Sequence, residues 1–186
     1  MKGKIPFNEN VRYVLRDKNG CKKKIFKYNW LGKKLSTHGI EMRGWLFGTK
    51  DFEMNIANAT VTTGRAAAAG KLGGESVIAD FEWIAIGIGT DDVATTDTAL
   101  GSESTTGGCE RDTTAATVSL VTTSGGTTDD TLQLVTEFTI TGTFAITESG
   151  VFNDDTTGVM LARQKFAAIN VSSGDTLQIT WKLQIT

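Results

Sequence analysis

The sequence predicts a mainly β protein, an antiparallel β-sandwich of jelly-roll type with one short helix. Three observations predict it. Threonine, a β-branched residue suited to half-solvated strands, occurs 29 times in 186 residues, and 27 of these lie after residue 50. Short apolar segments after residue 75 are separated by turns rich in glycine, serine and aspartate. No helices are predicted that could cover a parallel sheet.

Charge and pattern divide the chain into three parts. Residues 1–50 contain 13 Lys/Arg and 3 Asp/Glu, whereas residues 51–186 contain 6 Lys/Arg and 18 Asp/Glu. We interpret residues 1–50 as a basic N-terminal anchoring segment, residues 51–75 as transitional and residues 76–186 as the β-sandwich domain. We therefore expect that removing residues 1–50 leaves a folded sandwich that no longer joins its partner.

The first 75 residues contain few regular elements. Strands are predicted at residues 11–16, 21–30 and 52–56. Asn19-Gly20 predicts a hairpin turn between the first two, because both residues tolerate a positive φ. The alanine run at residues 66–69 predicts about two turns of helix, ended by the glycines that follow.

The remainder reads as six or seven strands. They are predicted at residues 77–89, 115–123, 131–141, 144–152, 159–171 and 177–185, and residues 159–171 form either one long strand or two broken ones. The last is the clearest, because apolar side chains from Leu177 to Ile185 alternate strictly with polar ones. Gly150 indicates a bulge or bend. Residues 90–111 are rich in Thr, Asp, Ser and Gly and predict a long surface loop.

Three ordered motifs lie in this region. Phe81–Thr90 and then Asp97–Glu103 fit F-x-x-I-A-I-G-x-G-T and D-T-A-L-x-x-E. Phe144–Asn153 contains I-T-E-x-G-V-F, and Gly158–Arg163 is followed by Gly174–Trp181. Their combination resembles structural proteins of tailed bacteriophages. The resemblance implies a non-enzymatic component of the virion, but the first 50 residues do not share it.

The resemblance leaves three functions open. The first is a capsid decoration or cement protein that stabilises the phage head through lateral subunit packing and docking of its basic arm. The second is a tail or fibre-attachment protein. The third, of another class, is a carbohydrate-binding module on the virion surface. Sugar binding is less favoured, because the loops after residue 75 lack the Trp and Tyr that stack on sugars.

Nine residues of the basic segment combine cationic and aromatic side chains and are the candidate docking residues. They are Lys22, Lys23, Lys24, Phe26, Lys27, Tyr28, Trp30, Trp45 and Phe47. Aromatic anchors with steering cations suit docking on an acidic surface of another virion protein, such as the major capsid protein. Such a pattern can also hold single-stranded nucleic acid, but we favour protein. The many edge strands favour a homo-oligomer, with a trimer as the first expectation.

No catalytic residue, metal site or cofactor is predicted. The single histidine, His38, lies in a turn sequence without the neighbours of a catalytic triad. We interpret Glu148 as a structural hydrogen-bond acceptor at a bend. The acidic pairs at residues 91–92, 129–130 and 154–155 lack the spacing of a calcium loop and suit turns. Cys21 and Cys109 are expected to be unpaired, and neither a signal peptide nor a transmembrane segment is visible.

Overall fold

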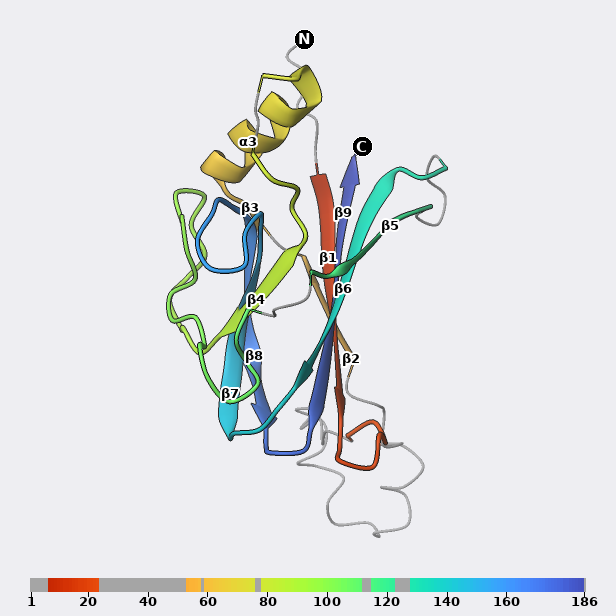
Figure 1. The fold of residues 1–186 in the computed structure, drawn as a ribbon, viewed down its shortest axis with the longest axis vertical. Helices are drawn as coiled ribbons and strands as arrows, with labels where there is room; N and C mark the ends of the chain where they lie inside the picture. The colour runs from red at the N-terminus through yellow and green to blue at the C-terminus, as the bar shows by residue number, and fades with distance from the viewer. Residues whose placement is uncertain are drawn as a thin grey trace, which may run out of the picture.

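The computed structural model describes residues 7–23, 53–57, 59–75, 78–111, 115–122 and 128–185, which form two antiparallel sheets and one helix (Figure 1). One sheet has five strands, in the order β2 (Glu53–Ala57), β1 (Phe7–Arg16), β9 (Thr176–Ile185), β6 (Thr131–Thr139) and β5 (Thr117–Val121). The other has four, in the order β3 (Ala59–Thr60), β8 (Met160–Val171), β7 (Phe144–Phe152) and β4 (Trp83–Gly87).

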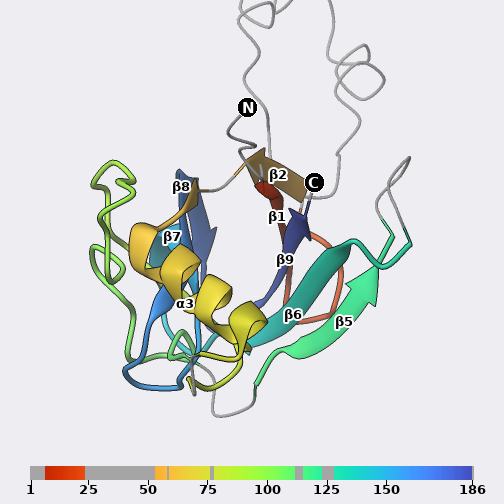
Figure 2. The same ribbon diagram turned by 90° about the horizontal axis from the view of Figure 1, so that it is seen from above.

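The two sheets face each other and enclose one main hydrophobic core (Figure 2). The strict alternation of β9 explains its role, since Leu177, Ile179, Trp181 and Leu183 all point into the core and are 0–4% exposed. Ile146 and Ile169, which are opposite each other on β7 and β8, supply the facing layer. The prediction of a mainly β, antiparallel sandwich is confirmed.

The helix α3 (Thr62–Gly73) lies across one end of the sandwich, next to β8 (Figures 1 and 2). It begins before the predicted alanine run and is terminated by its C-cap residue Gly74, which has a left-handed φ of 71°. Gly64 packs against the backbone of Leu161, so closely that a Cβ atom there would lie 2.5 Å from the Leu161 Cα. No helix in the described ranges is long and apolar enough to cross a membrane.

Two predicted strands differ from the structure. The apolar stretch at residues 77–89 forms a strand only at β4, from Trp83 to Gly87. Ser102 and Ser104 continue the backbone hydrogen bonding along β4, and Phe81 is buried in the core without belonging to a strand. Of the predicted strand at residues 21–30, only residues 21–23 lie in the described part, and there Lys22 forms an isolated bridge with Arg16.

The sandwich also includes β1 and β2, which precede residue 76. β1 is hydrogen-bonded on both sides, to β2 and to β9, and its Val11, Tyr13 and Leu15 are 0–2% exposed in the main core. The expectation that a folded sandwich survives removal of residues 1–50 is therefore corrected. That deletion would remove an interior strand and three core side chains.

Candidate functional site

Two of the nine candidate docking residues, Lys22 and Lys23, lie in the described part of the chain. The other seven lie outside it: Lys24, Phe26, Lys27, Tyr28, Trp30, Trp45 and Phe47. The Lys23 ammonium forms an ion pair with Asp175, a carboxylate only 5% exposed in the turn between β8 and β9. Asp175 also accepts a 2.7 Å hydrogen bond from the Ser172 amide. Lys23 thus ties the chain after β1 to the neighbouring turn.

The segment between Lys23 and Glu53 starts and finishes beside the same end of β1. The Lys23 amide donates a 2.8 Å hydrogen bond to the Leu15 carbonyl, and Glu53 is paired with Val14. The turns β6–β7 and β8–β9 lie at this end too, opposite α3 (Figure 1). The seven remaining candidate docking residues therefore belong to a segment tethered at both ends to one end of the sandwich.

A second polar feature centres on Glu148 of β7, which is completely buried. Its Oε1 accepts hydrogen bonds from the amides of Gly89 (3.0 Å) and Ser102 (2.7 Å), and its Oε2 accepts one from the Gly101 amide (3.0 Å). Arg163 of β8 donates to the same Oε2 from Nε at 3.0 Å. Both carboxylate oxygens are thus used to hold the chain on either side of residues 90–100, as expected for a structural acceptor.

Arg163 joins this carboxylate to a second one. Its guanidinium is 3% exposed and also pairs with Asp97 at 2.7 Å. Burial opposes ionisation of Asp97, but a hydrogen bond from the Ala94 amide and the ion pair with Arg163 outweigh it and lower the pKa of the Asp97 carboxyl. Burial likewise opposes the charge on Arg163, yet its bonds to Asp97 and Glu148 raise its pKa. The three residues form a charge-paired unit.

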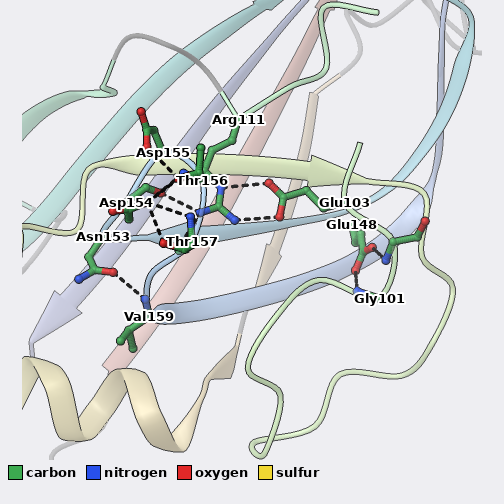
Figure 3. A network of polar contacts seen from close by, with 11 residues as sticks. Gly101, Glu103, Arg111, Glu148, Asn153, Asp154, Asp155, Thr156, Thr157 and Val159 are labelled. Atoms are coloured by element: carbon green, nitrogen blue, oxygen red, sulfur yellow. Dashed lines mark hydrogen bonds and ion pairs between the residues drawn. The ribbon is translucent and has the colours of Figure 1, made fainter. Parts of the chain in front are cut away.

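Arg111 forms a parallel anchor at the far end of the same loop (Figure 3). Its guanidinium binds the Glu103 carboxylate through two nitrogens, at 3.0 and 2.8 Å. It also donates 2.7 Å hydrogen bonds to the carbonyls of Asp154 and Thr157, and it lies 3.7 Å from the centre of the Phe152 ring. One buried cation therefore joins the loop before β5 to the turn between β7 and β8.

The turn between β7 and β8 contains Asp154 and Asp155, one of the three acidic pairs considered as calcium ligands. Asp154 Oδ1 accepts the amides of Thr157 (2.8 Å) and Thr156 (3.0 Å), which lowers the pKa of the Asp154 carboxyl to about 2. The carbonyls of Asp154 and Thr157 in this turn accept hydrogen bonds from Arg111. Within the described ranges, no group of three His, Cys, Asp or Glu side chains is placed to hold a metal ion.

A buried hydroxyl joins the two sheets across the core. Ser149 Oγ of β7 accepts a 3.2 Å hydrogen bond from the Trp181 indole of β9 and shares a 2.9 Å hydrogen bond with the Tyr13 hydroxyl of β1. Tyr13 and Trp181 are both fully buried, and burial raises the pKa of the Tyr13 phenol. The Tyr13 hydroxyl, the Trp181 indole and the Ser149 hydroxyl each have a hydrogen-bond partner, which offsets the cost of removing these polar groups from water.

No known protein family, curated protein or solved structure matches the chain. The function is therefore inferred from the polar network. The three motifs found in the sequence meet in it. Glu148 of the second motif binds Gly89 and Gly101 of the first and Arg163 of the third. Ser149 of the second motif also binds Trp181 of the third.

Sequence reasoning missed the two arginines that complete the network. Arg111 and Arg163 are the only arginines after residue 65. Arg163 stands within a predicted apolar strand, and a lone charge in such a place indicates a buried partner. That signal identifies the arginine as unusual. It does not identify Glu148 and Asp97, which lie 15 and 66 residues away.

Proposed function

We propose that the protein is a non-enzymatic structural component of a tailed-phage virion, a decoration protein that stabilises the head. It sits on the particle as a homo-oligomer and docks through its basic segment on an acidic surface, for which the major capsid protein is the candidate. The observation that carries the proposal is the convergence of the three motifs on Glu148. Segments that resemble phage structural proteins in order along the chain are also joined in space, as parts of one unit would be.

The architecture supports a mechanical role. The buried side chains of Glu148, Arg163 and Arg111 fasten the loop at residues 88–111 to β7, β8 and the turn after β7. Buried charges with good geometry resist separation, because removing one partner leaves the other unpaired in a low-dielectric interior. A loop held in this way keeps its shape when neighbouring subunits pack on it.

The basic segment fits the docking part of the proposal. The part of it that follows Lys23 leaves the described fold at Lys23 and rejoins it at Glu53, and both of these residues are hydrogen-bonded or paired to β1, so docking forces would be transferred directly to an interior strand of the sandwich. A tail or fibre-attachment protein would use the same two features at another place on the particle, and position on the particle separates these two functions.

A carbohydrate-binding module has less support. Trp181 is completely buried, and Trp83 is half-buried in β4. Neither described tryptophan is offered to a sugar from a loop, and the phage proposal is accordingly preferred.

The jelly-roll form of the sandwich is part of the same proposal. Its support is the nested order of antiparallel pairs, with β5–β6 innermost, then β4–β7, β3–β8 and finally β1–β9. Such nesting arises when one long hairpin is rolled up. The outermost and innermost pairs share the five-stranded sheet, and the two middle pairs form the other.

The experiment is incorporation of variants into particles. Lys24→Glu with Lys27→Glu reverses charge in the docking segment, and Lys182→Glu, an exposed position on β9, is the matched control. We expect the double variant to be strongly depleted from purified particles while Lys182→Glu is incorporated normally. Both purified variants should melt as the wild type does. Normal incorporation of the double variant would overturn docking through the basic segment, and absence of the wild-type protein from particles would overturn the virion function.

A further inference from the structure

The outer edge of β5 differs from the other three sheet edges. β3 is only two residues long, and residues 102–104 lie alongside β4, with an antiparallel bridge between Glu103 and Gly87 and a 2.9 Å hydrogen bond from the Ser104 amide to the Ile86 carbonyl. β2 contains the charged residue Glu53 and contacts β8 of the other sheet. Short strands, charges and covering segments are the usual ways in which proteins protect sheet edges.

β5 has none of these protections in the described part of the chain. Its sequence from Thr117 to Val121 contains no charge, proline or glycine, and its register with β6 has no bulge. No described strand pairs with its outer edge. An uncharged, regular edge strand of β-branched and apolar residues is a template for another strand.

Two apolar side chains of β5 lie on the core-facing side of their sheet but are not covered by the opposite sheet. Val118 is paired with Leu134 and Leu120 with Leu132, so both lie on the face of the sheet that elsewhere lines the core. Leu134 is fully buried, whereas Val118 and Leu120 are 46% and 62% exposed. Figure 2 shows the reason: β5 is the outermost strand of its sheet, on the side away from β7 and β8.

We propose that the occupant of this edge is β5 of a second copy, paired antiparallel about a twofold axis at Ser119. This register puts Val118 opposite Leu120 of the partner subunit and Thr117 opposite Val121 of the partner subunit. The apolar pairs meet on one face, and no like charges meet because β5 carries none. The chain as a whole has a formal charge of only −2, so long-range repulsion between copies is weak.

The inference refines the homo-oligomer of the proposed function. A twofold contact predicts an even number of copies, so it replaces the trimer expected from sequence. A single five-residue strand pair falls in the class of small interfaces below about 1,200 Å², so the contact is weak between free molecules. It is strengthened when copies are already held side by side on a particle.

The test is disulfide trapping in the full-length protein. Cys21 is exposed and is first replaced by serine, while the buried Cys109 is kept. Ser119→Cys places two thiols opposite each other across the axis, within the range of about 4–7 Å between Cα atoms that a disulfide spans. Thr117→Cys is the control, because its two copies would lie about 14 Å apart along the strands.

We expect mild oxidation at high protein concentration to give a dimer with Ser119→Cys at least about tenfold faster than with Thr117→Cys. Adding Val118→Lys and Leu120→Lys should abolish the cross-link, because like charges then oppose each other across the axis. Leu72→Lys, at an apolar residue of α3 that is 81% exposed, should not. Equal cross-linking of both cysteines, a monomeric Ser119→Cys protein, or no effect of the lysines would overturn the proposal. Particle incorporation does not enter this test, so the contact and the proposed function can fail separately.

Discussion

Replacing Glu148 by glutamine tests whether the buried network holds the loop at residues 88–111. Glutamine has nearly the same shape, but it lacks the charge and presents an NH2 group where one oxygen was. Glu148 Oε1 accepts two amides, and Oε2 accepts one amide and Arg163. Either orientation of the glutamine amide therefore sets a donor against two donors. It also leaves Asp97 as the one carboxylate that remains paired with the buried Arg163 among the described residues.

The expected loss of stability is about 3–5 kcal/mol, the usual cost of breaking a buried ion pair by removing one partner. At about 2–4 °C per kcal/mol for a protein of this size, the midpoint of thermal unfolding falls by about 6–20 °C. Calorimetry measures the shift, and hydrogen exchange of the Gly89, Gly101 and Ser102 amides shows whether the loop opens first. Glu110→Gln, at an exposed position of the same loop, is the control.

A result within about 1 kcal/mol of the control would refute the reasoning, because no buried charge pair of this geometry could then be contributing. Unchanged exchange of the three amides would refute the more specific claim that Glu148 holds the loop. A double-mutant cycle with Arg163→Met measures the coupling between the two side chains.

Three further predictions follow from single contacts. Gly89→Ala should strongly destabilise the folded protein, because the new Cβ would lie 2.3 Å from the buried Glu148 Oε1. Gly73→Ala should not, because the nearest atom to its Cβ would be 3.8 Å away. Chemical denaturation compares the two variants, and equal unfolding midpoints would contradict the packing around Gly89. The carboxyl pKa values of Asp97 and Asp154 are lowered by folding, so both carboxylates contribute stability that is fully present above the unfolded value near 3.9. This stability is lost as the pH falls through each folded pKa, which for Asp154 is about 2. The destabilisation caused by Asp97→Asn should therefore shrink as the pH falls below the unfolded value, and a constant difference would count against it. Cys21 is exposed, whereas Cys109 is buried and burial raises the pKa of its thiol to about 11. A thiol reagent should therefore modify only Cys21 in the native protein and both cysteines after denaturation. Rapid modification of both cysteines in the native state would be inconsistent with the burial of Cys109.

Local patterns predicted the strands well where one side of a strand is buried. The alternation of β9 from Leu177 onwards matches its burial, and Gly150 lies next to an irregularity in the pairing of β7 with β8, between Val151 and Phe152. The strand predicted at residues 77–89 is longer than the one observed, because a continuous apolar run does not show where hydrogen bonding to β7 begins. β4 starts only at Trp83.

Long-range pairing could not be predicted in the same way. β1 belongs to the sandwich because it pairs with β9, at the opposite end of the chain, and alternation within residues 11–16 carries no information about its partner. Similarly, the loop at residues 90–111 has the composition of a solvated surface. Its few buried residues, Leu100, Ser104, Cys109 and Arg111, are covered by contacts that form only when the chain folds. The structural role of Glu148 was expected from its place in the second motif, but its four donors could not be predicted.

The position of the protein on purified particles tests the central claim most directly. Electron cryomicroscopy of particles that contain the protein should show many copies of a two-sheet body distributed over the head surface. A few copies at a single vertex or on the tail would contradict the decoration function, and particles that lack the protein altogether would contradict a place in the virion.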